Sequence, residues 1–356
     1  MKNFLSNLGL LEIDGFQFKK RLGGGSALSS LYIRGDEKAV FKFLIAPRNL
    51  IELERFKLEY SVLEKNKANS VQNTEGFKPD ERVFLGPKTS YPLPRITLPL
   101  TSKFSNLVNY FAYSYEDGLL LSLLDTSKYS IEEKISLLYR LASGLNYFNQ
   151  TGYSHRDLHP ENILLLDDYS MPDITRHGSV NDPRVKILDM GNCQRINLDR
   201  DFIDRINRNL NEDEVFQDNN RRILTSFVSM APDFLEKGEE TKNYDTWSFG
   251  IYAYKLLFNK MPCITNQIGD ITSLRKQQRF SDNYLFNLES LPLGLNLVLK
   301  QLLSSNGDER PSIDAIVRLF SWLVFHSERF KDRDFIIQVI NENGFDPNYD
   351  FRDDYC

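Results

Sequence analysis

The residues best able to do chemistry in this chain are an aspartate and an asparagine five positions apart, Asp157 and Asn162. They lie in the run His155-Arg156-Asp157-Leu158-His159-Pro160-Glu161-Asn162, between Gly152 and the apolar stretch 163–166. An aspartate can orient a hydroxyl group and accept its proton, and an amide oxygen is a hard ligand that suits Mg²⁺. The spacing therefore predicts a loop that presents both groups to a metal-bound phosphate.

A second acidic group follows a short apolar stretch. The residues Val185-Lys186-Ile187-Leu188 predict a strand, and Asp189-Met190-Gly191 comes directly after it. A carboxylate after a buried strand, followed by a flexible glycine, suits a bridge to Mg²⁺ between phosphates. An Asp-x-Gly sequence alone is a common turn, but the apolar lead-in and the distance from Asn162 favour a metal ligand.

A glycine-rich segment lies near the N-terminus. Alternating apolar residues predict strands around 16–18, 31–33 and 39–43. Between the first two strands the chain carries Leu22, Gly23, Gly24, Gly25 and Ser26. Glycines and small residues let a backbone approach phosphate oxygens closely and aim N–H groups at them. A glycine-rich turn alone is more often a plain hairpin loop. Other residues must therefore show whether this one binds phosphate.

Together these segments resemble the eukaryotic-type protein kinases. The run from His155 to Asn162 has the family's H-R-D-x-x-x-x-N pattern, and Asp189-Met190-Gly191 stands where the family has Asp-Phe-Gly. The resemblance covers roughly residues 16–326 and implies an α+β, bilobal protein-kinase-like fold. Its implied lobes are residues 1–115, an antiparallel β-sheet with one main helix, and the mainly α-helical residues 116–356.

The resemblance also implies roles for single residues. Lys42 would grip the α- and β-phosphates of ATP, and Glu59, in a helix expected over 49–65, would be its partner, with Glu64 as the alternative. Asp157 would be the catalytic base. Asn162 and Asp189 would bind Mg²⁺, with Mn²⁺ as the alternative ion. The other implied site residues are Arg156 and His159 in the catalytic loop, and Leu22, Gly23, Gly24, Gly25, Ser26, Tyr113 and Tyr115 at the nucleotide, the two tyrosines in a hinge over 111–118.

The second half of the chain carries further family features. Helical spacing predicts a helix over 131–150 with Ser130 as its N-cap, and later helices over about 291–305, 312–326 and 333–343. Asp245, in Asp-Thr-Trp-Ser-Phe-Gly, resembles the aspartate that braces the catalytic loop, although a plain N-cap fits the same place. Asp233, in Ala-Pro-Asp, replaces the family's glutamate, and Arg310 resembles its partner.

Departures from the family pattern bear on the reaction. Leu28 or Ser29 stands at the third glycine of the family's loop, and His159 stands where Ser/Thr kinases usually have lysine. The sequence Asp157-Leu158-His159-Pro160 also resembles aminoglycoside- and choline-kinase-like phosphotransferases. Arg156, the Ala-Pro-Asp sequence and the Asp245 motif favour a Ser/Thr protein kinase. A small-molecule or lipid phosphotransferase and a non-catalytic pseudokinase scaffold stay open as alternatives.

Regulation is indicated by Arg156, which directly precedes the catalytic aspartate. An arginine there suggests control by a phosphate in the activation segment, through a charge-assisted contact. The candidate sites are Thr225, Ser226 and Ser229. Polar insertions at 66–100, 167–184 and 195–224 are where a regulatory partner or protein substrate would bind.

Composition narrows the remaining classes. The 356 residues carry a net charge of -5, which disfavours a nucleic-acid partner, and no stretch approaches the roughly 18 apolar residues of a membrane span. Cys193, Cys263 and Cys356 lie far apart, as free thiols of a reducing compartment do. We therefore expect a cytoplasmic protein that acts on protein substrates; delivery into a host cell stays open.

Overall fold

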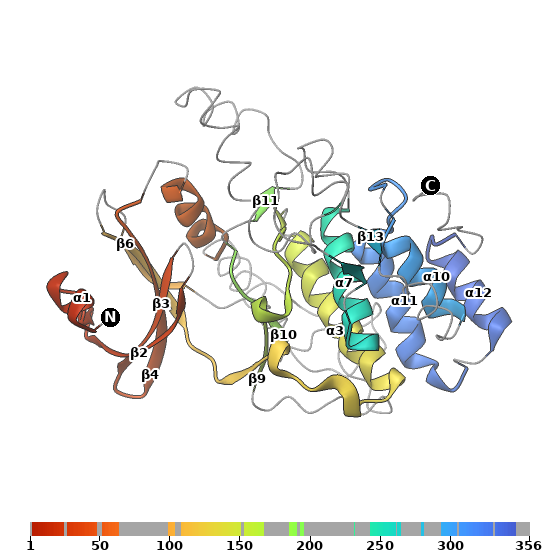
Figure 1. Ribbon diagram of the computed structural model, residues 1–356, viewed down its shortest axis with the longest axis horizontal. Coiled ribbons are helices and arrows are strands. Elements are labelled where there is room, and N and C mark those ends of the chain that lie inside the picture. The colour runs from red at the N-terminus through yellow and green to blue at the C-terminus, as the bar shows by residue number, and fades with distance from the viewer. Residues whose placement is uncertain are drawn as a thin grey trace, which may run out of the picture. The chain divides into compact units, whose positions relative to one another are not determined.

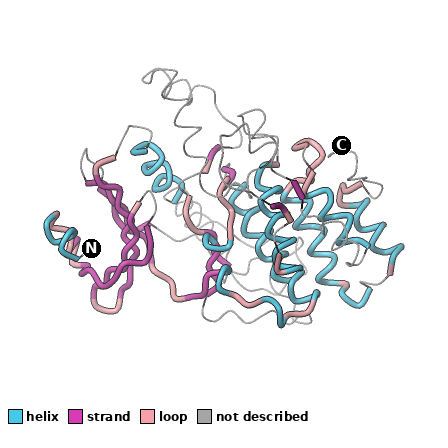
Figure 2. Tube along the Cα trace, viewed as in Figure 1, coloured by secondary structure: helices cyan, strands magenta, loops and turns pink. Residues whose placement is uncertain are grey.

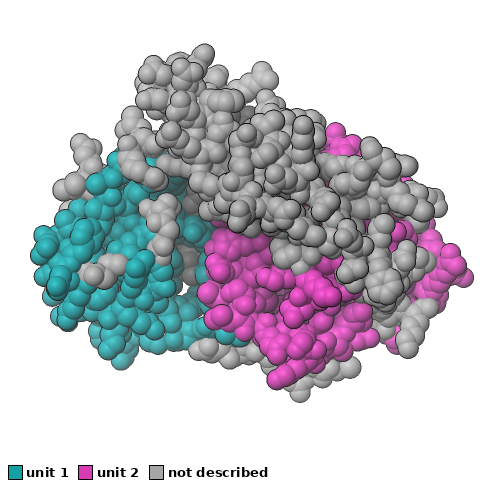
Figure 3. Space-filling model, in the orientation of Figure 1, with its two compact units in different colours: residues 1–119, 164–168, 186–192 teal, residues 120–163, 169–185, 193–356 magenta. Residues whose placement is uncertain are grey.

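The computed structural model describes residues 2–24, 27–47, 52–63, 99–103, 108–150, 153–166, 185–190, 193–195, 231, 243–260, 262–264, 279–280, 293–304, 306–329 and 332–346. The chain divides into two compact units (Figure 3). Unit 1 comprises residues 1–119, 164–168 and 186–192, and unit 2 comprises residues 120–163, 169–185 and 193–356. Strands dominate the described part of unit 1 and helices that of unit 2 (Figure 2).

Unit 1 is built on an antiparallel sheet whose described strands run in the order β1-β2-β3-β4-β6-β5 (Figure 1). These strands are β1 (Glu12–Ile13), β2 (Phe16–Gly24), β3 (Leu28–Arg34), β4 (Glu37–Ile45), β5 (Pro99–Lys103) and β6 (Val108–Ser114). The three strands predicted from alternation are confirmed as parts of β2, β3 and β4. Gly35 turns the chain between β3 and β4 with a left-handed φ of 57°, which glycine adopts without strain.

An aromatic cluster covers one face of this sheet, and the N-terminal helix α1 (Lys2–Asn7) closes it. Leu5 is fully buried there, and the Tyr32 hydroxyl donates a 2.6 Å hydrogen bond to the Leu10 carbonyl. Burial raises the pKa of Tyr32 above its ordinary value. The sheet residues that α1 and Leu10 cover are Phe16, Tyr32, Phe41, Phe43 and Tyr110. The N-terminal segment is therefore part of the core of unit 1.

The opposite face of the sheet receives a helix. Residues 52–63 are helical, which confirms the described part of the helix predicted over 49–65. Its buried side chains recur at helical spacing, and the Phe56 ring lies 4.8 Å from the ring of Phe111 on β6. Tyr110 and Phe111 are neighbours on a strand and so point to opposite faces, one toward α1 and the other toward this helix.

A second sheet, in the order β10-β9-β7, contains β7 (Gly118–Leu120), β9 (Ile163–Leu166) and β10 (Val185–Ile187). The strand predicted ahead of Asp189 is thereby confirmed. Gly118 is required here, because a Cβ on it would lie 2.4 Å from the Leu165 carbonyl oxygen. The hinge predicted over 111–118 is shorter than expected, since residues 111–114 continue β6 and Gly118 begins β7. Only residues 115–117 link the two strands, and Glu116 in this link forms an ion pair with Lys186 on β10.

Unit 2 is mainly helical. Its described helices are α3 (Ile131–Gln150), α7 (Tyr244–Phe258), α10 (Leu293–Leu302), α11 (Ile313–Phe325) and α12 (Arg333–Glu342). The helix predicted over 131–150 is confirmed with the same bounds, and the three predicted after residue 290 are confirmed as α10, α11 and α12 with slightly shorter ones. α3 packs against α11 and α7, and α10 packs against α7 and α12 (Figure 1). The shorter elements are η1 (Leu121–Leu123), η2 (Thr126–Lys128), β8 (Tyr153–Ser154), η3 (Pro160–Asn162), β11 (Gln194–Arg195), β12 (Cys263–Ile264), β13 (Arg279–Phe280) and η5 (Ser327–Arg329). None of the described helices is both long and apolar enough to cross a membrane.

Local sequence explains where α3 begins. The Ser130 hydroxyl accepts from the backbone N–H of Glu133 at 3.2 Å, and the Glu133 carboxylate accepts from the backbone N–H of Ser130 at 2.7 Å. This reciprocal pair is a capping box, which satisfies donors that the helix itself leaves unpaired. The predicted N-cap is confirmed. The start of α3 is thereby fixed, and its other end leads toward the loop that carries Asp157.

Replacing Leu5 with alanine should show that the N-terminal helix belongs to the core of unit 1. Leu5 has no exposed surface, so Leu5→Ala leaves a cavity and should lower the free energy of unfolding by about 2–4 kcal/mol. Phe4→Ala is the matched control, because Phe4 is 48% exposed and should cost less than about 1 kcal/mol. Urea unfolding of the two variants checks this, and equal effects would contradict the role given to Leu5.

Candidate active site

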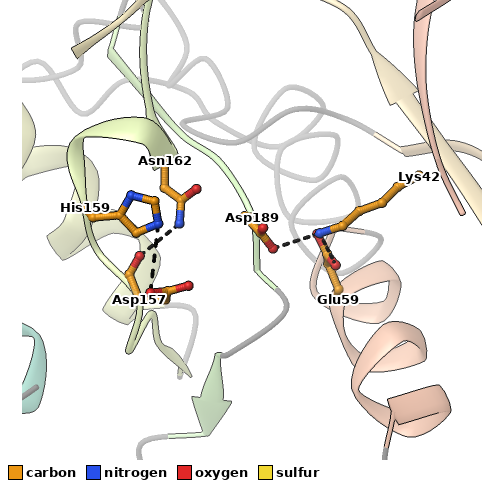
Figure 4. Close-up of polar contacts among 6 residues, drawn as sticks. All are labelled: Lys42, Glu59, Asp157, His159, Asn162 and Asp189. Atoms are coloured by element: carbon orange, nitrogen blue, oxygen red, sulfur yellow. Dashed lines mark hydrogen bonds and ion pairs between the residues drawn. The ribbon is translucent and has the colours of Figure 1, made fainter. Parts of the chain in front are cut away.

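Lys42 holds two carboxylates in unit 1. Its Nζ lies 2.9 Å from both carboxylate oxygens of Glu59 and 2.8 Å from Oδ1 of Asp189 (Figure 4). The lysine comes from β4, the glutamate from the 52–63 helix, and the aspartate from the residues after β10. The predicted pairing of Lys42 with Glu59 is present, and Glu64, the alternative partner, lies outside the described residues.

Charge is unbalanced in this cluster. Burial by itself would lower the pKa of Lys42, but the carboxylates of Asp189 and Glu59 outweigh burial and raise its pKa above the ordinary value. Burial also raises the pKa of Glu59 to about 7, against the opposing charge of Lys42 and with a further increase from Asp189. When all three groups are ionised, one positive charge faces two negative ones. A cation that binds Asp189 would relieve this excess.

The backbone of the following residue completes the cluster. Glu59 accepts a hydrogen bond from the backbone N–H of Met190. Asp189 itself has a left-handed φ of 57°, a conformation that aspartate adopts more readily than most residues. Sequence reasoning missed the role of the Met190 N–H, because a backbone donor leaves no trace in residue type.

Tyr113 faces the cluster, whereas Tyr115 lies beyond the strand. Lys42 pairs with Phe111 and Val40 pairs with Tyr113 across β4 and β6, so these four side chains share one face of the sheet. Burial raises the pKa of Tyr113, and the charges of Lys42, Glu59 and Asp189 act on it as well. Tyr115 donates its backbone N–H to the Lys38 carbonyl at 3.0 Å. Of the two predicted tyrosines, Tyr113 therefore belongs to the surroundings of Lys42.

The glycine-rich segment is described as far as Gly24. A Cβ added at Gly23 would meet no atom within 4 Å, and Leu22 is 41% exposed. The packing of unit 1 therefore does not itself require glycine at position 23, which is compatible with a role toward a ligand. Gly25 and Ser26 lie outside the described residues.

In unit 2 a buried carboxylate holds the backbone of the loop before Asp157. Asp245 accepts from the backbone N–H of His155 at 2.8 Å and from that of Arg156 at 2.9 Å. Arg156 has a left-handed φ of 62°, a costly conformation for this residue that the two hydrogen bonds stabilise. The plain N-cap interpretation of Asp245 is wrong, because Asn243 is the N-cap of α7. Asp245 instead binds the loop, as the resemblance implied.

Beyond that brace, Asp157, His159 and Asn162 are arranged around one turn. The Asn162 amide donates to the Asp157 carbonyl at 3.0 Å, and its backbone N–H donates to the His159 carbonyl at 2.8 Å. These bonds fix the amide, whose Oδ1 is the atom that the resemblance assigns to a metal ion. His159 Nε2 lies 3.9 Å from Asp157 Oδ1 (Figure 4), too far for a hydrogen bond and suited to one bridging oxygen atom. The side chains of Asp157 and His159 could therefore contact the same bound oxygen atom.

Comparison with known families decides the classification. A sequence model of the protein kinase domain matches residues 102–321, which include the Asp157 loop, Asp189 and Asp245. The chain belongs to the protein kinase family. Its fold class is therefore as predicted: the kinase has an α+β, bilobal fold, with an antiparallel β-sheet in one part and helices in the other.

Several curated proteins are similar to this kinase. Rat (Rattus norvegicus) citron rho-interacting kinase is 27% identical over 250 residues, 67% of this chain and 10% of that protein. Serine/threonine-protein kinase PKH2 of Candida albicans is 26% identical over 337 residues, 91% of this chain and 29% of that protein. A calcium and calcium/calmodulin-dependent serine/threonine-protein kinase of Lotus japonicus is 27% identical over 194 residues, 53% of this chain and 31% of that protein. The kinase spans between a tenth and a third of the length of these relatives.

The regulatory elements predicted from the sequence are only partly described. The Arg156 guanidinium lies 5.9 Å from the centre of the Tyr244 ring on α7, and Arg310 is almost fully buried, 6.0 Å from the Trp247 ring. The residues expected to face these arginines lie outside the described residues: Thr225, Ser226, Ser229 and Asp233. Control of the kinase by a phosphate at Arg156 and the pairing of Arg310 with Asp233 stay predictions. The insertions at 66–100, 167–184 and 195–224 also lie almost wholly outside the described residues.

The oxygen donors of each unit suit a divalent metal ion that is bound together with a nucleotide. Within the described residues no group of three or more His, Cys, Asp or Glu side chains could hold a metal ion by itself. Asp189 offers a hard oxygen beside Lys42 in unit 1, and Asn162 offers one in the loop of unit 2. Divalent metals such as Mg²⁺ are often bound by one or two such ligands plus substrate phosphates and water. The two carboxylates around Lys42 carry more negative charge than Lys42 balances, which also favours the binding of a cation at Asp189.

The raised pKa of Glu59 predicts a pH dependence of stability. Between about pH 4.5 and pH 7 the folded kinase binds a proton at Glu59 more readily than the unfolded chain does, so this stabilisation is present at low pH and is lost as pH rises through 7. The stability of the wild type relative to Glu59→Gln should therefore fall by about 1–3 kcal/mol between pH 5 and pH 7.5.

Urea unfolding at a series of pH values, without metal or nucleotide, measures this difference. Glu54→Gln is the control, because Glu54 is exposed on the same helix and its ion pair with Lys57 lies at the surface. A difference between the wild type and Glu59→Gln that stays constant over this pH range would show that Glu59 does not titrate there.

Proposed function

We propose that the protein is an ATP-dependent protein kinase that transfers the γ-phosphate to Ser or Thr hydroxyls of protein substrates. The observation that carries the proposal is the buried Lys42, paired with Glu59 and in contact with Asp189. A lysine buried with two carboxylates is costly for a fold to keep, and it supplies the positive charge that nucleotide phosphates need. The membership of the protein kinase family supports this use.

We assign the nucleotide to groups of unit 1. Lys42 binds the α- and β-phosphates, and the backbone of Gly23, Gly24, Gly25 and Ser26, next to Leu22, covers them. Tyr113, on the same sheet face as Lys42, and Tyr115, just after the strand, complete the nucleotide contacts. Asp189 and Asn162 offer oxygen ligands to Mg²⁺, with Mn²⁺ as the alternative ion. Bound Mg²⁺·ATP supplies the phosphoryl group and neutralises its charge.

We assign the acceptor to Asp157 and His159. An oxygen about 2.8 Å from both atoms can donate its proton to Asp157 Oδ1 while it accepts from His159 Nε2–H. As the hydroxyl oxygen attacks the γ-phosphorus, the bond from that phosphorus to the β–γ bridging oxygen breaks and ADP leaves. The hydroxyl proton passes to Asp157, which acts as general base. Because Asp245 fixes the backbone ahead of Asp157, the carboxylate is held in place before the acceptor arrives. Catalysis then depends mainly on positioning and charge.

The two alternative functions are a small-molecule or lipid phosphotransferase and a pseudokinase scaffold. The Asp157-x-His159-Pro160 sequence favours a small-molecule or lipid acceptor, since it also resembles aminoglycoside- and choline-kinase-like enzymes. The serine/threonine-protein kinases among the relatives favour a protein acceptor. A pseudokinase scaffold would not need Lys42, Asp157, Asn162 and Asp189 together, so the complete set supports an enzyme.

Transfer of label from γ-labelled ATP tests the proposal. Purified wild type with Mg²⁺ and a generic protein acceptor should label Ser or Thr, and Asp157→Asn should lower the rate about 10²–10⁴-fold because the base is lost. Asp36→Asn, in the exposed β3–β4 turn, is the control and should keep full activity.

Three results would argue against a Ser/Thr protein kinase. Label on a small molecule or lipid and not on protein would favour the alternative acceptor. The scaffold would be favoured if the protein bound ATP but transferred phosphate to no acceptor, even with cell lysate added as a source of activating partners. Equal rates for wild type and Asp157→Asn would remove Asp157 from the mechanism.

Substitution of His159 should separate its role as a hydrogen-bond donor from its charge. His159→Gln keeps an N–H donor and should lower kcat by less than about fivefold, whereas His159→Ala removes the donor and should lower kcat about tenfold or more. KM for ATP should change little in either variant, because the proposed phosphate contacts lie in unit 1. Steady-state kinetics against ATP and against acceptor check this. Equal losses in the two variants would show that donation by residue 159 is not what matters.

A further inference from the structure

Asn149, in the last turn of α3, uses its side-chain amide to join three elements of unit 2. The amide nitrogen donates to the Tyr153 carbonyl on β8 at 2.8 Å and to Oδ2 of Asp245 on α7 at 3.0 Å. An amide nitrogen carries two hydrogens, so these two bonds use its whole donor capacity.

The carboxylate that Asn149 contacts is the one that holds the catalytic loop. Asp245 Oδ2 also accepts from the backbone N–H of His155 at 2.8 Å, so Asn149 and the loop share one oxygen atom. Asp245 is 3% exposed, and a buried carboxylate is stable only when its oxygens are hydrogen-bonded. Removing the Asn149 donor therefore weakens the hold on the group that orients His155 and Arg156.

The second bond of Asn149 acts at the start of the same loop. Tyr153 lies on β8, which pairs with β11 and leads within four residues to Asp157. Fixing the Tyr153 carbonyl and Asp245 from one side chain sets the spacing between β8 and α7. The loop backbone from residue 153 to residue 156 is then held at both ends.

We propose that Asn149 is a positioning residue for the catalytic aspartate. It contacts neither ATP nor acceptor; it keeps the Asp245 carboxylate and β8 in the register that presents Asp157. This inference rests on the proposed kinase function for its effect on rate, but its effect on the loop is measurable without activity.

Three substitutions and a matched control test the inference. Asn149→Leu has a similar size and no donor, and Asn149→Asp keeps the shape but places a carboxylate against Asp245 and the Tyr153 carbonyl. Asn149→His carries Nδ1 at the same number of bonds from the backbone and keeps one donor. Asn146→Leu is the control: Asn146 lies one turn earlier on α3, and its amide donates to Asp314 on α11, at 3.4 Å.

The expected kinetic result is a loss of kcat without a loss of nucleotide affinity. Misplacement of a catalytic group by about 1 Å can cost about 10²-fold in rate. Asn149→Leu and Asn149→Asp should lower kcat about 10–100-fold with KM for ATP changed less than about twofold. Asn149→His should recover at least part of the loss, and Asn146→Leu should match the wild type.

Hydrogen exchange of residues 153–158, measured by mass spectrometry on the full chain, decides the inference independently of activity. Exchange should accelerate about tenfold or more in Asn149→Leu and stay unchanged in Asn146→Leu. Unchanged exchange and kcat in Asn149→Leu would overturn the inference, as would equal losses of kcat in Asn149→Leu and Asn146→Leu. If the wild type transfers no phosphate, the kinase proposal fails, while accelerated exchange in Asn149→Leu alone still supports the tie to the loop.

Discussion

The constraint on which the rest of the described structure depends is the burial of charge. Lys42 is 8% exposed on a strand lined with aromatic residues, where an unpaired ammonium group would be too costly to keep. It is stable because the 52–63 helix brings Glu59 and the residues after β10 bring Asp189. Three elements far apart in the chain are therefore fixed to one another by a single side chain. The same contacts leave one more negative than positive charge in the cluster when all three groups are ionised. A cation that binds Asp189 would relieve this excess.

In unit 2 the buried charge is negative: it is the carboxylate of Asp245, which also needs partners to be stable. The described donors to Asp245 are the backbone N–H groups of His155 and Arg156 and the Asn149 amide, all of them uncharged groups. Several dipoles aimed at one carboxylate replace the water that it lost on folding. The cost of the left-handed backbone at Arg156 is offset in this way. The loop thus has its shape because a buried oxygen needs donors.

The resemblance to the protein kinases predicted most of these residues. It assigned Lys42 from its place after the glycine-rich segment and Glu59 from its place in the following helix, and the Asp157 and Asn162 pattern marked the loop. Asn149 was missed because an asparagine near the end of an amphipathic helix looks like part of its polar face. The length of the hinge was wrong because alternation cannot show where β6 stops when both strand and link are aromatic. The donor at Met190 could not be predicted, since every residue except proline carries the same backbone N–H.

His159 shows how a single departure from the family pattern acts through geometry. A lysine at this position would bring a permanent positive charge on a flexible chain, whereas an imidazole brings a directed N–H whose charge depends on pH. In the structure that ring lies 3.9 Å from the Asp157 carboxylate, a distance that a single oxygen atom can bridge. On the proposed mechanism that oxygen belongs to the acceptor hydroxyl, which accepts from the N–H of His159 and donates to Asp157. The proposal therefore gives histidine the role of a directed donor in place of the lysine.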